Sequence, residues 1–141
     1  MSYATRDDML AAIGEDALVE LTDRTDSGVV DDAVLAAALT AADAEIDAYV
    51  ARVAVLPLPR VPGVLRRIAV SIARWRLSAD MADGRERIDY QDALRQLEQI
   101  AKGLIDLGLP ADGDPPARTR PQVAGVAAPR RTGADLGGDW P

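Results

Sequence analysis

Three prolines within six residues, at positions 57, 59 and 62, separate two stretches of this chain that both have helical periodicity. Each proline fixes its own φ and disfavours the α conformation at the residue before it. We therefore expect Leu56–Pro62 to be a stiff, extended connector whose apolar side chains lie against the rest of the protein. Pro62 is well placed near the start of a helix.

The residues before the connector predict a long helix that begins at Asp31 and Asp32 and ends near Arg52. The two aspartates place negative charge at the helix N-terminus, where the helix dipole favours it. Its apolar side chains recur at steps of three and four residues, as on one face of a helix. They are Leu35, Leu39, Ala42, Ile46, Tyr49 and Val53.

Two more helices are predicted after the connector, separated by a break at Ala82-Asp83-Gly84. The first runs from about Gly63 to Met81, and its apolar stripe includes Trp75, which we expect in the core. The second runs from near Arg85 to near Gly103. The apolar positions are Leu65, Ile68, Ile72, Trp75 and Ala79 in the first helix, and Ile88, Leu94, Leu97, Ile100 and Leu104 in the second.

Two short helices are predicted at the N-terminus. Thr5 is a favourable N-cap with Asp8 at the N3 position, and Gly14 ends the first helix. The second extends from Glu15 to about Leu21, and Thr22–Val30 is expected to be a loop.

The composition agrees with helices rather than strands. There is no Phe, aromatic residues make up 4% of the chain, and much of the apolar content is alanine. Alanine has the highest helix propensity and lets helices pack closely, whereas sheets favour aromatic and β-branched residues. We predict an all-α fold, a small bundle of about four to five helices over residues 1–107.

The last segment, 108–141, has a different character, because prolines and glycines are interleaved throughout it. Such a segment buries too little apolar surface to offset the conformational entropy of ordering, about 1–2 kcal/mol per residue. We expect an extended, non-regular C-terminal tail that partners order. Trp140 near its end is either incidental or an anchor into a pocket on another protein.

Composition also limits the chemistry. With no Cys and no His, the chain lacks thiolate nucleophiles, disulfides and the commonest general base. We predict that it is not an enzyme and holds no cofactor. The charged N-terminus does not resemble a signal peptide, and no apolar run is long enough to span a bilayer. We expect a soluble, intracellular protein that does not bind membranes.

Two groups of acidic residues resemble chemical sites, one for metal binding and one for acid–base catalysis, but we favour a structural interpretation of both. Asp23–Gly28 resembles the first half of a calcium loop, but the twelfth position, where such a loop has a Glu, is Val34. We favour an Asx-type turn that caps the next helix. Asp43 and Asp47 lie one helical turn apart and are capable of acid–base work when buried, but we favour a solvated acidic face.

Charge is unevenly distributed. Residues 1–107 carry a net charge of −7 and residues 108–141 are neutral. The body has one concentrated basic region, on the helix predicted over 63–81. We expect that helix to pack beside the acidic helix, within a subunit or between subunits, and the alternative is a DNA-binding face. The residues concerned are Arg66, Arg67, Arg74 and Arg76, with Arg85 and Arg87 beyond.

Several segments, in their order and spacing, resemble the Mu-type phage head-region family over about residues 1–109. They are Tyr3–Asp8, Leu21–Arg24, Ala44–Tyr49, Leu56–Leu58 with Val61–Pro62, and Ile72–Leu77. The resemblance implies a head–tail connector, or adaptor, in the neck of a phage or a related particle such as a gene transfer agent, assembled in the bacterial cytoplasm. Such proteins form a ring, commonly of twelve subunits, beneath the portal protein, and the resemblance supplies no catalytic residues.

The resemblance implies as partners other copies of the chain, the portal protein and a downstream neck or tail-completion protein. DNA would pass through the channel without specific binding. The alternative function is a DNA-associated packaging accessory or regulator that uses the basic helix 63–81. We predict portal or partner contacts at Arg118, Arg120, Arg130, Arg131 and Trp140. We predict contacts between subunits at Arg66, Arg67, Arg74, Asp43 and Asp47.

Overall fold

The computed structural model describes residues 1–78 and 84–109, which form five α-helices and contain no strand. The helices are α1 (Arg6–Ile13), α2 (Glu15–Thr22), α3 (Asp32–Val50), α4 (Gly63–Leu77) and α5 (Gly84–Ala101). The predicted all-α bundle is therefore confirmed. Residues 79–81 of the predicted fourth helix, and the predicted tail apart from Gly108 and Leu109, lie outside the described residues. None of the described helices is long and apolar enough to cross a membrane.

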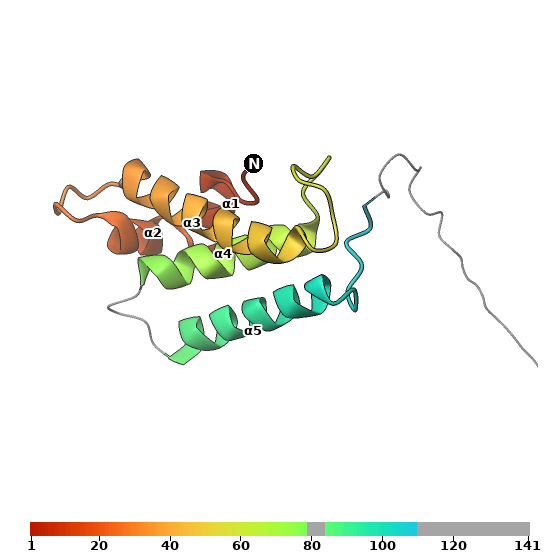
Figure 1. Cartoon of the computed structure of the whole chain (residues 1–141). Helices are drawn as coiled ribbons and strands as arrows, with labels where there is room; N and C mark the ends of the chain where they lie inside the picture. The colour runs from red at the N-terminus through yellow and green to blue at the C-terminus, as the bar shows by residue number, and fades with distance from the viewer. Residues whose placement is uncertain (79–83, 110–141) are drawn as a thin grey trace, which may run out of the picture. The chain divides into compact units, whose positions relative to one another are not determined.

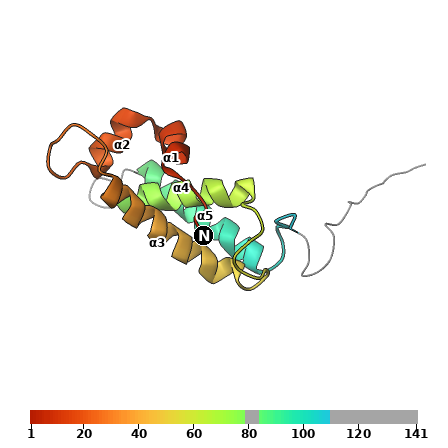
Figure 2. The same cartoon turned by 90° about the horizontal axis from the view of Figure 1, so that it is seen from above.

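Met1–Leu107 forms one compact unit built around the three longer helices. The helix α3 packs against α4, and α5 packs against both (Figure 1). The direction of the chain reverses from α3 to α4 and again from α4 to α5. The short helices α1 and α2 lie together beside this layer, where they contact α4 and α3 respectively (Figure 2).

The core is formed by aliphatic side chains from all three long helices. The largest fully buried ones include Leu35, Ile46, Leu65, Ile68, Ile72, Leu97 and Ile100, all of which were predicted apolar positions. Leu58 of the connector is buried as well, and Leu56 and Val61 are half-buried, as expected for a segment that lies against the bundle.

Three residues that were predicted on the apolar faces of helices are exposed instead of buried. Val53 is 44% exposed and Leu104 is 74% exposed, because α3 ends at Val50 and α5 ends at Ala101, so neither residue lies on a helix face. Ile88 is 55% exposed. The buried face of α5 contains Ala93 and Leu97, and Ile88 lies five residues before Ala93, which places it on another side of the helix.

Trp75 was predicted in the core but is only half-buried. Its ring stacks on that of Tyr90 from α5, with centroids 5.3 Å apart and planes inclined by 13°. An offset stack of this kind adds about 0.5–1.5 kcal/mol to the burial of the two rings. Trp75 therefore joins α4 to α5 at the edge of the core.

The predicted caps of the first helix are confirmed. The Thr5 hydroxyl accepts from the Asp8 amide, and the Asp8 carboxylate accepts from the Thr5 amide, which is a capping box. Gly14 ends α1 with φ at +84°, a conformation that favours glycine, and α2 begins at the next residue.

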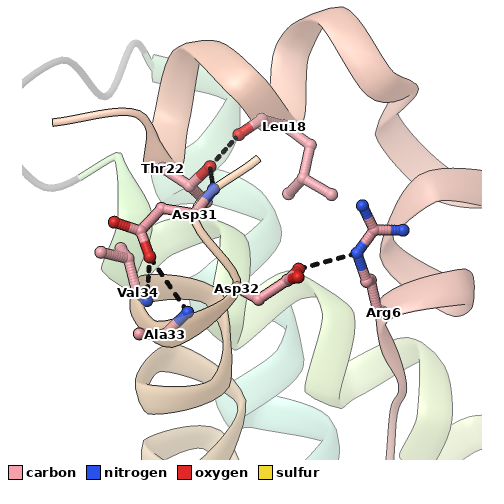
Figure 3. A network of polar contacts seen from close by, with 7 residues as sticks. All are labelled: Arg6, Leu18, Thr22, Asp31, Asp32, Ala33 and Val34. Atoms are coloured by element: carbon pink, nitrogen blue, oxygen red, sulfur yellow. Dashed lines mark hydrogen bonds and ion pairs between the residues drawn. The ribbon is translucent and has the colours of Figure 1, made fainter. Parts of the chain in front are cut away.

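A hydrogen-bond network holds the start of α3 (Figure 3). Thr22 is the last residue of α2 and not the start of the loop. Its buried hydroxyl donates to the Leu18 carbonyl at 2.8 Å and accepts from the Asp31 amide at 3.1 Å. The Asp31 side chain in turn caps α3 by accepting from the amides of Ala33 and Val34. Thr22 and Asp31 thus close the loop between α2 and α3 at its base.

Candidate interaction surfaces

The two central carboxylates of α3 bind the N-terminal segment of the same chain. Asp43 accepts from the Tyr3 amide at 2.9 Å, and Asp47 accepts from the Tyr3 hydroxyl. Tyr3 is almost completely buried, and both carboxylates are half-buried. The prediction of a simply solvated acidic face is therefore wrong for this pair. Sequence reasoning missed the contact because Tyr3 lies 40 residues before Asp43.

This environment shifts two ionisations in the same direction. Burial raises the pKa of the Asp43 carboxyl above its usual value, and the bond from the Tyr3 amide offsets part of that shift. Burial, followed by the hydrogen bond to Asp47, raises the pKa of the Tyr3 phenol well above its ordinary value. Tyr3 thus remains a neutral hydrogen-bond donor at physiological pH. The segment lies beside an open hollow of about 510 Å³ lined by Met1, Ser2, Ala36, Leu39, Thr40, Asp43, Ala44 and Asp47.

Three of the four arginines on α4 have ion-pair partners within the chain. Arg66 lies 3.7 Å from the carboxylate of Asp8 in α1. Arg74 pairs with Glu86 of α5 at 2.9 Å, and Arg76 pairs with Glu45 of α3 at 2.8 Å. The expectation that the basic helix packs beside the acidic one is thus confirmed, and it holds within one subunit.

Glu45 also connects three helices at the edge of the core. Its second carboxylate oxygen accepts from the Tyr90 hydroxyl of α5 at 2.8 Å, while the first binds Arg76 of α4. Burial, and then the hydrogen bond to Glu45, raises the pKa of the Tyr90 phenol. Because Trp75 stacks on the same tyrosine ring, the cluster joins α3, α4 and α5. No residue near Tyr90 in the sequence indicates this contact, since its partner lies 45 residues away.

Asp23, directly before the loop 24–30, holds that loop through its side chain. Its carboxylate accepts from the amides of Thr25, Ser27 and Gly28, at 3.3, 3.0 and 2.7 Å. These bonds lower the pKa of Asp23 to about 2, with Ser27 and Gly28 as the largest causes. The Asx-type turn is confirmed by the bond to Thr25, but the residue that caps α3 is Asp31. Residues 1–78 and 84–109 contain no cluster of three or more potential metal-ligating side chains.

The predicted partner-binding residues of the tail lie outside the described residues. They are Arg118, Arg120, Arg130, Arg131 and Trp140. Of the residues predicted to lie between subunits, Asp43, Asp47, Arg66 and Arg74 all have partners within the chain. Arg67 is exposed on α4.

Comparison with known proteins identifies relatives over most of the chain. The family model described as Bacteriophage Mu, Gp36 matches residues 3–125, which extends beyond the segment 1–109 that carries the resemblance. The Mu-like prophage FluMu protein gp36 of Haemophilus influenzae is 36% identical over 112 residues, 79% of each chain. Gene product J of Escherichia phage Mu is 38% identical over 110 residues, 77% of this chain and 78% of that protein. The chain therefore belongs to the phage Mu gp36 family.

Proposed function

We propose that this protein is a structural head–tail connector of a Mu-like phage or phage-like particle. Copies of the chain form a ring beneath the portal protein and join the head to a downstream neck or tail-completion protein. Membership of a phage protein family over residues 3–125 is the observation that carries this proposal. The connector role itself comes from what the resemblance to head-region proteins implies.

The internal bonding of the bundle supports a structural role. Side chains at Glu45, Arg74 and Arg76 connect its long helices to one another. A rigid unit of this kind suits a ring wall, because its surfaces are already ordered before they meet a partner. We further propose that the protein is not an enzyme. The carboxylate pair at Asp43 and Asp47, the candidate for acid–base chemistry, holds the N-terminal segment through Tyr3.

Portal capture tests the connector proposal. The full chain should be retained by immobilised portal protein of the same phage. A truncation after Gly108 should keep its helical circular dichroism spectrum and lose retention, because we propose that the tail carries the portal contacts. Replacement of Arg118, Arg120, Arg130 and Arg131 by Gln in the full chain should weaken retention as well.

A matched control for these tail variants is Arg95→Gln, at an exposed site on α5. It removes a positive charge from the bundle and should leave retention unchanged. Retention of the truncated chain at full strength would contradict the proposed role of the tail. Loss of its helical spectrum would show that residues 109–141 are needed to fold the bundle.

Contacts between subunits are proposed at Arg66 and Arg67. Arg66 is exposed and its distance to Asp8 is long, and Arg67 is exposed, so charge reversal at both should cost the monomer little stability. The double variant R66E/R67E should therefore weaken ring formation more than it lowers the free energy of unfolding. Rings that form as readily as with the parent chain would remove both residues from the interface.

The DNA-binding alternative has less support. Nucleic-acid affinity arises from cations that are available to phosphates, and Arg66, Arg74 and Arg76 have carboxylate partners within the chain. We propose instead that the net charge of −7 on residues 1–107 lets DNA slide past without adhering. Titration of duplex DNA at several salt concentrations distinguishes the two functions, because tight binding with a steep salt dependence would favour the DNA-associated one. A basic channel lining in an assembled ring would also contradict the sliding hypothesis.

A further inference from the structure

One end of the helical unit combines exposed apolar side chains with positive charge. The segment 51–62 after α3 and the segment after α5 lie at the same end in both views (Figures 1 and 2). They expose Val55 to 72% and Leu104 to 74%. Arg52 and Lys102 lie in the chain shortly before these residues, are exposed, and have no ion-pair partner among the described residues. We name Arg52, Val53, Val55, Lys102 and Leu104 the basic end.

The loop between α2 and α3 lies at the opposite end of α3 (Figures 1 and 2). It exposes Val29 to 61%, and Asp26 is exposed beside it in the chain. Exposed Glu20 near the end of α2 adds a further negative charge. We name Glu20, Asp26 and Val29 the acidic end. Exposed Arg24 in the same loop and exposed Asp106 after α5 offset part of these charges. Residues 20–30 still carry a net charge of −2, from Glu20, Asp23, Asp26 and Arg24, and residues 51–62 with 102–107 carry +2, from Arg52, Arg60, Lys102 and Asp106. Each end thus combines apolar surface with a net charge, and the two net charges have opposite signs.

The acidic end is ordered before any partner binds. Asp23 fixes the loop through three of its backbone amides, and Thr22 and Asp31 join its two ends. A loop held in this way loses little conformational entropy when another surface covers Val29, so the contact forms at a lower cost.

The two ends of one copy cannot meet each other. They are separated by α3, whose 19 residues span about 28 Å at 1.5 Å per residue. The complementary surfaces of this chain are therefore available only to other copies. A contact between two different patches of identical chains is heterologous, and repeating it produces a closed ring or an open filament.

We propose that copies of this chain associate head to tail, with the basic end of one copy against the acidic end of the next. The occupant of each end is a second copy, because the net charges of the two ends are opposite and each end exposes apolar side chains that the other can cover. This inference deepens the proposed function and rests on it only for the closure of the contact into a ring.

The test measures self-association of the full chain by sedimentation velocity over a concentration series, in solution and bound to portal protein. Reversal of the basic end, R52E/K102E, should weaken self-association about tenfold or more. The variant E20K/D26N alters the acidic end and should do the same. Asparagine is chosen at position 26 because that residue has φ of +59°, which Asn tolerates.

Sedimentation of a mixture of the two charge variants is the decisive experiment. R52E/K102E retains an intact acidic end, which can bind only a basic end, and E20K/D26N retains an intact basic end. The mixture should therefore form heterodimers that neither variant forms alone. The control R95E changes an exposed charge in the middle of α5 and should associate like the parent chain. V55S/L104S tests the apolar component and should also weaken association.

Self-association of both charge variants at parental strength would overturn the inference. So would a parent chain that is monomeric in solution and binds the portal without cooperativity between copies. Portal capture that persists in R52E/K102E while self-association is lost would support the inference and leave the proposed function intact. Self-association without any portal capture would remove the proposed function and leave the head-to-tail contact standing.

Discussion

Replacement of Tyr3 by Phe isolates the contact that holds the N-terminal segment on α3. The change keeps the buried ring and removes only the hydroxyl that donates to Asp47. Hydrogen bonds to charged groups contribute about 1.5–3 kcal/mol, and the half-buried carboxylate is left with one donor fewer. We therefore expect Tyr3→Phe to lower the free energy of unfolding by about 1.5–3 kcal/mol.

Urea denaturation followed by circular dichroism measures this effect, as a shift of the midpoint at constant slope. Tyr49→Phe is the matched control, because Tyr49 is a half-exposed tyrosine on α3, the helix that Tyr3 contacts. This change should alter the free energy of unfolding by less than about 0.5 kcal/mol. Combining Tyr3→Phe with Asp47→Asn should cost less than the sum of the two single changes. Strict additivity, or a Tyr3→Phe variant as stable as the parent, would refute the reasoning.

Three further predictions concern pH and the core. Burial raises the pKa of Asp43, so the contribution of this carboxyl to the free energy of unfolding is present below the unfolded pKa of 3.8 and is lost as pH rises through the folded pKa. Asp43→Asn should remove this loss, which urea denaturation at a series of pH values measures. The pKa of Tyr3 is also raised, so stability should fall as pH rises above 10.0, and less steeply in Tyr3→Phe, which alkaline unfolding curves will measure. Leu97→Ala should lower stability by about 2–5 kcal/mol because Leu97 is fully buried, whereas Leu104→Ala should change it by less than about 0.5 kcal/mol, both by urea denaturation.

Local chemistry explains which parts of the fold were predictable from sequence. The caps at Thr5 and Gly14 depend on residues within a few positions of each other, so the sequence pattern identifies them. The cap of α3 was assigned to the turn at Asp23–Gly28, whereas the side chain that caps the helix is Asp31. Helical periodicity likewise identified most of the large buried side chains of α3, α4 and α5, but it missed Val50, Leu77 and several buried alanines. It failed at Val53, Ile88 and Leu104 because periodicity does not state which helix face a neighbour covers or where the last turn ends.

The contacts that the sequence did not reveal are long-range. Asp43 and Asp47 looked like a polar face of α3 because nothing near them in the chain indicates a donor. Glu45 and Tyr90 come together only because α5 packs against α3. Of the predicted surface residues, the acidic pair and most of the arginines of α4 have partners within the chain. Arg67 and the residues that define the basic and acidic ends have no such partner among the described residues, and we propose contacts between copies there as well as at the exposed Arg66.

Electron cryomicroscopy of the full chain mixed with portal protein from the same phage is the most direct test of the connector role. The account predicts a closed ring of copies attached to the portal. Within that ring, the loop 23–30 of each copy should contact the segments 51–62 and 102–107 of its neighbour. Portal particles that carry no attached chain, at concentrations where the protein is folded, would contradict it.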